Sequence, residues 1–130
     1  MKASDQVNGN IEVIGNCAYY RPVGTVTLEE AVGLLDQAMA QARDQRIPKL
    51  FINTKGLIGV RSPSLPERYF FVRQWAATGR GLVQLALTVH AEMIDPEKFG
   101  TTVARNAGLI ADVFSEEPEA LAWLLSEPEP

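Results

Sequence analysis

Hydrophobic and polar positions along this chain follow two periods in turn, and the change of period predicts alternating strands and helices. The clearest alternation runs from Leu82 to His90, where every second residue from Val83 to Val89 is a larger apolar one. Residues 50–52 are continuously apolar, as is typical of a strand covered on both faces. These patterns predict strands at residues 11–14, 17–20, 49–54, 82–90 and 109–114.

Capping boxes mark the starts of the first two predicted helices. Thr27 stands three residues before Glu30, a spacing in which hydroxyl and carboxylate satisfy each other's free N–H groups at a helix start. Ser64 and Glu67 repeat the pattern. The first helix cannot continue through Pro48, which lacks an N–H group and clashes with the preceding turn.

Two more helices are predicted in the last third of the chain. Asp95 followed by Pro96 is typical of an N-cap and a first helical turn. The inward residues of this helix should be Phe99, Val103 and Ala107. Ser115 is expected to cap the final helix, and the acidic Glu116 and Glu117 suit its N-terminal dipole.

Strands separated by helices of this length imply right-handed crossovers and therefore a mostly parallel sheet. Gly15 and Asn16 both tolerate a positive φ, so they suit a tight turn joining the first two strands as an antiparallel hairpin. The predicted fold is a single-domain α/β sandwich with a mostly parallel central sheet, an N-terminal hairpin and about four helices. One domain is expected over residues 1–130, with a core from about 10 to 126 and a frayed tail at 127–130.

The net charge and the cysteine content exclude some classes of partner and of covalent bond. A formal net charge of −4 argues against nucleic acid, because such binding needs clustered Lys and Arg to displace counterions. Cys17 is the single cysteine and cannot form an internal disulfide. Residues 1–6 lack the apolar core of a signal peptide, and no apolar run approaches the ~20 residues that would span a bilayer. We therefore expect a cytoplasmic protein without membrane insertion.

Three segments near the C-terminus carry a family resemblance: residues 95–100 (Asp-Pro-Glu-Lys-Phe-Gly), 103–108 (Val-Ala-Arg-Asn-Ala-Gly), and 113–124 with its closing Ala-Leu-Ala-Trp-Leu. Together with the order of elements from about residue 10 onward, they resemble the STAS-like (SpoIIAA-like, STAS/SEC14-like) small α/β domains. The resemblance implies that fold and a non-enzymatic regulatory or protein-interaction role. It names no partner.

The carboxyl ends of the parallel strands are the default place for a site, because ligands of open α/β sheets prefer that crevice. The sequence brings Asn53, Thr54, the loop around Arg61 and Ser62, and His90 to this edge. His90 is the only histidine, so no zinc site of several His or Cys ligands is expected, and a nucleophile pair with Cys17 would require two distant elements to meet. We expect no enzyme and no cofactor.

Ser62 is a candidate phosphoacceptor by comparison with the resembled family. STAS-domain antagonists of anti-sigma factors carry an acidic residue at this loop, followed by a phosphorylatable Ser or Thr pair and a glycine. Here the corresponding stretch is Arg61-Ser62-Pro63-Ser64, with a base in place of the acid and a proline between the serines. This departure argues against partner switching by phosphorylation, since Ser64 has a structural role as the helix cap.

The second helix is the best candidate for an interaction surface. At 100° per residue its broad apolar face contains Leu65, Tyr69, Phe71, Val72, Trp75 and Ala76. Phe70 falls almost opposite Val72 and should be exposed, so we expect an interface around Phe70, Phe71, Gln74 and Ala77. Arg68 falls within the apolar face, where its guanidinium must reach a carboxylate, a carbonyl, the solvent edge or a ligand anion.

Two functions follow from these patterns. The favoured one is a non-enzymatic interaction domain that binds a second copy of the chain or another protein. The alternative is a binder of a small apolar or acyl ligand, as the SEC14-like resemblance implies, held between the aromatic helix and the sheet. A chain of 130 residues should leave little room for a pocket of roughly 300 Å³ or more.

Overall fold

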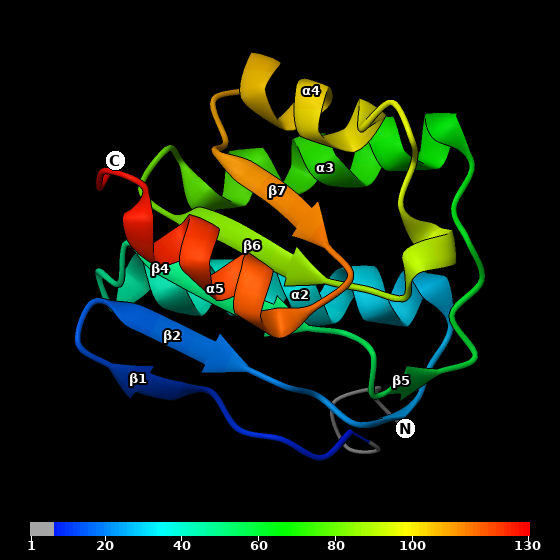
Figure 1. Ribbon diagram of the computed structural model, residues 1–130, viewed down its shortest axis with the longest axis horizontal. Helices are drawn as coiled ribbons and strands as arrows, with labels where there is room; N and C mark the ends of the chain where they lie inside the picture. The colour runs from blue at the N-terminus through cyan, green and yellow to red at the C-terminus, as the bar shows by residue number, and fades with distance from the viewer. Residues whose placement is uncertain (1–6) are drawn as a thin grey trace.

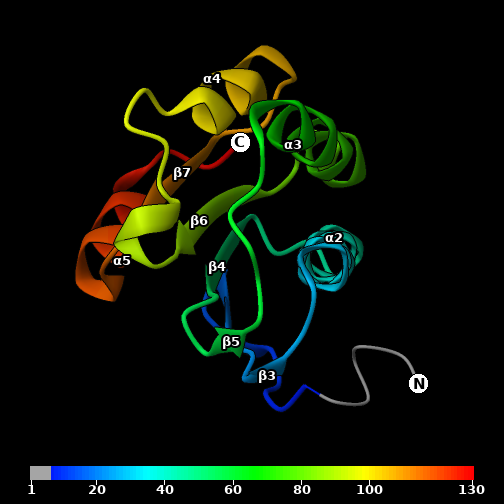
Figure 2. The ribbon, with the colours of Figure 1, turned by 90° about the vertical axis from the view of Figure 1, so that its right-hand side faces the viewer.

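The computed structural model describes residues 7–130 as a five-stranded sheet with helices on both faces (Figures 1 and 2). Helices α2, α3 and α4 cover one face, and α5 covers the other (Figure 2). The strands are β1 (Glu12–Ile14), β2 (Cys17–Tyr20), β3 (Gly24–Thr25), β4 (Lys49–Asn53), β5 (Leu57–Ile58), β6 (Gln84–Thr88) and β7 (Ala111–Phe114). The helices are α2 (Leu28–Asp44), α3 (Leu65–Gly79), the short 3-10 turn η1 (Ala91–Met93), α4 (Phe99–Asn106) and α5 (Glu117–Ser126).

The sheet has the order β1-β2-β4-β6-β7. β1 and β2 form the antiparallel hairpin that the Gly15-Asn16 pair predicts, and the other neighbours all pair in parallel. The predicted α/β sandwich with a mostly parallel sheet is therefore confirmed. Among the described residues, no helix is both long and apolar enough to span a membrane.

Alternate residues of the central strands feed two separate cores. Leu50, Ile52 and Leu85 face α2 and α3, whereas Phe51 and Ala86 face α5. Strand β6 is therefore covered on both faces, although its alternation suggested an apolar side and a more polar side. The polar residues of that second side, Gln84 and Thr88, are buried beneath α5.

Both predicted capping boxes are present. The Thr27 hydroxyl accepts a hydrogen bond from Glu30 N at 3.1 Å, and the Glu30 carboxylate accepts one from Thr27 N at 2.9 Å. The Ser64 hydroxyl accepts from Glu67 N at 3.3 Å, and the Glu67 carboxylate accepts from Ser64 N at 2.9 Å. These local interactions set where α2 and α3 begin.

The predicted starts of the last two helices were wrong. Asp95 and Pro96 form a turn, and α4 begins only at Phe99, whose N–H donates to the Asp95 carboxylate at 2.7 Å. The inward residue on its last turn is Ala104, while Ala107 is exposed and lies beyond the helix. Helix α5 has Glu116 as its N-cap, in place of Ser115, with no side-chain cap hydrogen bond.

The segment between β4 and α3, where the sequence predicts no strand, contains a short one. Its residues Leu57 and Ile58, which form β5, pair in parallel with β3, and Leu57 is buried. A run of two residues is too short to show a period, so the sequence carried no signal for this strand.

The C-terminal tail, which we predicted to fray, lies along the amino ends of the strands. The carbonyls of Leu124 and Glu127 accept hydrogen bonds from Lys49 Nζ at 2.7 and 2.6 Å. The Pro128 carbonyl accepts from Gln84 Nε2, and Glu129 accepts from Asn16 Nδ2 at 2.7 Å. Polar residues near the strand starts therefore donate to backbone carbonyls of α5 and the tail and to the Glu129 carboxylate.

Candidate functional site

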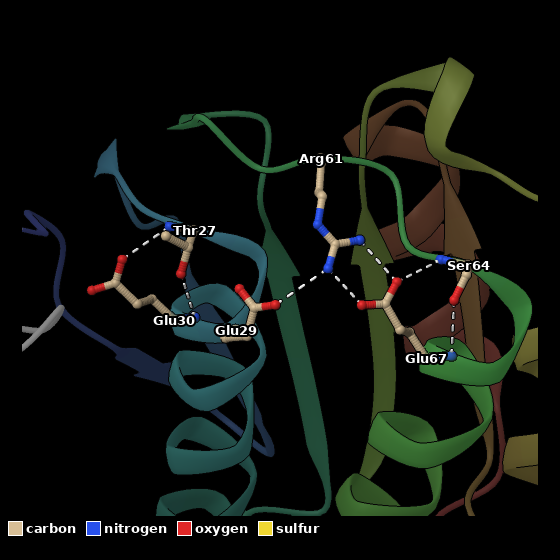
Figure 3. A network of polar contacts seen from close by, with 6 residues as sticks. All are labelled: Thr27, Glu29, Glu30, Arg61, Ser64 and Glu67. Carbon is tan, nitrogen blue, oxygen red and sulfur yellow. Dashed lines mark hydrogen bonds and ion pairs between the residues drawn. The ribbon is translucent and has the colours of Figure 1, made fainter.

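An ion-pair network joins the first turns of α2 and α3 (Figure 3). Arg61, in the loop before α3, contacts Glu29 on α2 at 3.2 Å and both carboxylate oxygens of Glu67 on α3. The Arg61 guanidinium, with a further hydrogen bond from Ser64 N, lowers the pKa of Glu67 to about 2. In turn, the Glu67 carboxylate raises the pKa of Arg61. The candidate binding residue Arg61 therefore connects two helices and is not one of the residues that line the cleft described below.

The strand-end candidates divide between the two faces of the sheet. Asn53 has the same parity as Phe51, so it points toward α5 and donates to the Glu117 carboxylate at 2.6 Å. Thr54 donates to the Thr88 carbonyl at 3.0 Å, and His90 Nε2 lies 3.2 Å from the Lys55 carbonyl. These polar groups hold the loops at the carboxyl ends of β4 and β6.

Asn53 shares its carboxylate partner, Glu117, with Arg21, a residue that the sequence analysis did not single out. Arg21, just after β2, forms a two-pronged ion pair with Glu117, with Arg21 Nε 2.8 Å from Glu117 Oε2. Hydrogen bonding from Arg21, supported by Asn53, lowers the pKa of Glu117. Because the two residues stand 96 positions apart, no local pattern could have found the pair.

Cys17 and His90 lie at opposite ends of the sheet. Cys17 pairs in register with Lys49 at the start of β4, while His90 follows the carboxyl end of β6. Cys17 is buried, and burial raises the pKa of its thiol. The structure therefore does not bring these two residues together as a nucleophile and a base.

Phe70 is exposed on α3, as its helical phase predicts, with 71% of its surface accessible. Gln74 and Ala77 are exposed beside it, whereas Phe71 turns inward and stacks on Trp75 with ring centroids 4.7 Å apart. Phe71, which we expected at the interface, is therefore not part of the exposed surface of α3 defined below.

The buried face of α3 is narrower than predicted. Leu65 and Tyr69, expected to be buried, are 52% and 38% exposed. Tyr69 contacts Phe70 edge to face, and Arg73 donates to the Tyr69 hydroxyl at 2.9 Å. The fully buried residues of the helix are Val72, Trp75, Ala76 and Gly79. We define the exposed residues Tyr69, Phe70, Arg73, Gln74 and Ala77 as the α3 surface.

Arg68 points away from the α3 surface and reaches a backbone carbonyl, one of the alternatives that its position allowed. Its Nη2 donates to the Met93 carbonyl at 3.1 Å and lies 3.5 Å from the Ser62 hydroxyl. Among residues 7–130, no carboxylate forms an ion pair with it. Ser62 itself is exposed.

A cleft of about 560 Å³ lies between α3 and the sheet, against the expectation of little spare volume. Its apolar wall includes Leu35, Leu57, Phe71, Val72, Trp75, Leu85, Leu87 and Leu109. Among the predicted site residues, Thr54, Arg68 and His90 line the cleft, whereas Asn53, Arg61 and Ser62 do not. Periodicity assigns side chains to faces but does not set the distance between a helix and the sheet, so it could not predict this space.

Comparisons with solved structures identify the fold. The chain is similar to the crystal structure of an anti-sigma factor antagonist from Mycobacterium paratuberculosis, with 14% identity and a TM-score of 0.53 over 97% of this chain and 100% of the other. It is also similar to an uncharacterised protein with a SpoIIAA-like fold from Shewanella loihica, with 18% identity and a TM-score of 0.51 over 92% and 94% of the two chains. No protein-family model matches, and no curated protein matches. The chain therefore has the SpoIIAA-like fold that the resemblance of its C-terminal segments implies.

Proposed function

We propose that this protein is a non-enzymatic regulatory domain that works by binding another protein chain through the α3 surface. The observation that carries the proposal is the exposure of Phe70, an aromatic side chain 71% accessible near the middle of a helix. Aromatic and Arg side chains are enriched at protein interfaces, and a buried ring at an interface centre is a typical hot spot. Side chains of both types lie next to it, because Tyr69 contacts Phe70 edge to face and the Arg73 guanidinium lies over the Tyr69 ring.

A regulatory role agrees with one use of this fold. The similar protein from Mycobacterium paratuberculosis is named as an anti-sigma factor antagonist, so the fold serves there in regulation. The engagement of the polar strand-end residues in loop hydrogen bonds also favours binding over catalysis in this chain. We therefore assign the working surface to α3 and not to the strand ends.

We further propose that the α3 surface pairs with a second copy of itself. Glu67 and Arg73 lie three residues on either side of Phe70. Two α3 helices that cross in antiparallel orientation at Phe70 would bring the two Phe70 rings together and would place Arg73 of each copy beside Glu67 of the other, whose carboxylate also holds Arg61 of its own chain. A twofold interface needs this kind of self-complementarity, with an apolar centre and opposite charges on its two sides.

The test is a comparison of oligomeric mass across a dilution series by light scattering. Phe70→Asp should shift the protein toward monomer while leaving its thermal melt near that of the wild type, because surface substitutions usually change stability by about 0.5 kcal/mol or less. Leu125→Asp is the matched control, since Leu125 is 51% exposed on α5, across the sheet from α3. It should leave the oligomer intact.

Three outcomes would contradict the proposal in different ways. A Phe70→Asp variant with unchanged mass would remove Phe70 from the interface. A wild type that is monomeric at every concentration would reject pairing of identical chains and leave a different protein as the partner of the α3 surface. Loss of the folded monomer in Phe70→Asp would show that the ring contributes to the core.

A further inference from the structure

The cleft between α3 and the sheet is larger than close packing leaves in a small domain. Protein interiors have few voids larger than a water molecule, whereas small-molecule sites have volumes of roughly 300–1,000 Å³. The cleft, at about 560 Å³, lies within that second range. Leu87 of the central strand β6 and Val89 just after it line the cleft and remain only partly buried, so apolar strand surface faces it.

The walls of the cleft favour an apolar occupant. Trp75 from α3 and Leu35 from α2 face Leu85 and Leu87 from β6 across it, and α4 closes a further side with Ala104. Trp75, Leu35, Leu85 and Ala104 are already buried, so the gain from replacing water with hydrocarbon, roughly 25 cal/mol per Å² of apolar surface buried, would come from the partly exposed Leu87, Val89 and Phe71.

Of the basic side chains that line the cleft, Lys98 and Lys55 are paired with carboxylates and Arg68 is not, within the described residues. Lys98 is neutralised by Asp112, with Lys98 Nζ 2.7 Å from Asp112 Oδ1. The Asp95 carboxylate accepts from Phe99 N. Lys55 lies 3.6 Å from Glu116. Within the part of the chain that the structure describes, the Arg68 guanidinium has no carboxylate partner, and it is only partly exposed, so an anion there would meet a weakly screened charge.

We infer that the cleft binds a small amphiphile with an apolar body and one acidic head group, the body lying against Trp75 and the β6 side chains and the head on Arg68. Guanidinium groups bind carboxylate and phosphate by paired hydrogen bonds, so both head groups belong to this class. This site lies on the inner side of α3, whereas the proposed protein interface uses its outer side. The inference therefore goes beyond the proposed function and can fail without it.

The experiment uses Trp75 as the reporter. The chain has two tryptophans, and Trp123 packs against Phe114 on the α5 side of the sheet. In a Trp123→Phe background, titration with decanoate should give a saturable change in Trp75 fluorescence below the concentration at which decanoate forms micelles. Decyl phosphate tests the other acidic head group. Decan-1-ol and decyltrimethylammonium, which offer the same chain with a neutral and a cationic head, should bind at least tenfold more weakly, since charged hydrogen bonds contribute about 1.5–3 kcal/mol.

Two variants locate the head group and the chain. Arg68→Gln keeps a donor for the Met93 carbonyl but removes the charge, so it should weaken decanoate about tenfold and leave decan-1-ol unchanged. Arg105→Gln, at an exposed arginine of α4 outside both the cleft and the α3 surface, is the matched control and should change neither affinity. Ala111→Phe fills the cleft from β7 and should abolish the fluorescence change.

The inference would be overturned by absence of a saturable signal with both acidic probes, by equal affinity for all four probes, or by decanoate binding that is the same in Arg68→Gln as in the parent. If Ala111→Phe fails to melt cooperatively, the Arg68→Gln comparison still decides the result. Phe70→Asp should bind decanoate as the parent does, which separates this site from the α3 surface.

Discussion

Arg61 and Glu67 face each other with two parallel hydrogen bonds, Arg61 Nη1 to Glu67 Oε1 at 2.8 Å and Arg61 Nη2 to Glu67 Oε2 at 2.5 Å. The same carboxylate also accepts from Ser64 N, so one side chain both caps α3 and holds the loop before it. A second contact of Arg61, with Glu29, extends this arrangement to α2. The contacts of Glu67 with Arg61 and Ser64 favour its ionised carboxylate.

This pair predicts a loss of stability in acid. The folded-state pKa of Glu67 is about 2, below its ordinary value of 4.5, so its contribution is present above pH 4.5 and is lost as the pH falls toward 2. We expect Glu67→Gln to flatten the fall in unfolding free energy across that window, as measured by urea denaturation at a series of pH values. The effect should be modest because solvent screens an exposed pair.

Glu119→Gln, on the exposed side of α5, is the control for the acid experiment. Its unfolding free energy should fall with decreasing pH at the same slope as that of the wild type. Parallel slopes for Glu67→Gln and the wild type would show that the pair does not stabilise the folded state.

Leu85 should be among the most sensitive core positions. It is 1% exposed at the centre of the sheet, between β4 and β7, and packs toward α2 and α3. Leu85→Ala should reduce the unfolding free energy by about 2–5 kcal/mol through lost transfer energy and a residual cavity. Urea denaturation measures the loss, and Leu125→Ala, at an exposed leucine, is the control. Surface substitutions usually change stability by about 0.5 kcal/mol or less, so a loss below that for Leu85→Ala would contradict the packing described.

Cys17 and His90, the two residues weighed as a catalytic pair, should be dispensable for folding and for oligomerisation. Because Cys17 and His90 lie at opposite ends of the sheet, Cys17→Ser and His90→Gln should leave a folded protein with the oligomeric mass of the wild type. Light scattering and circular dichroism measure both properties. A hydrolytic or transfer activity of the wild type that either change abolished would reject the non-enzymatic proposal.

Ser62 should carry little phosphate. Although its hydroxyl is exposed, Arg61 before it and Pro63 after it depart from the acidic residue and Ser or Thr pair of the resembled antagonists. Phosphopeptide mapping of the protein purified from native cells in growth and in stationary phase measures the occupancy. Substantial modification of Ser62 under either condition would favour regulation by partner switching.

Local patterns determined most of the secondary structure. The capping boxes at Thr27 and Ser64 fixed two helix starts because their partners lie three residues away, within the same turn. The apolar run of β4 and the alternation of β6 placed these two strands. The exposure of Phe70 also followed from helical phase alone. In each case, the interactions that decide the structure join residues close in sequence.

Contacts between distant residues decided what these patterns could not. Leu65 and Tyr69 belong to the apolar face of α3 in sequence, yet they are exposed because the packing of α3 against α2 and α4 covers only a narrow strip of the helix. The burial of Lys49 depends on carbonyls of α5 and the tail more than 70 positions away. The cleft beside Arg68 depends on the spacing of α3 from the sheet. A sequence period specifies the direction of each side chain, but only the assembled elements set the distances between them, and those distances decided both the cleft and the place of Arg68 beside it.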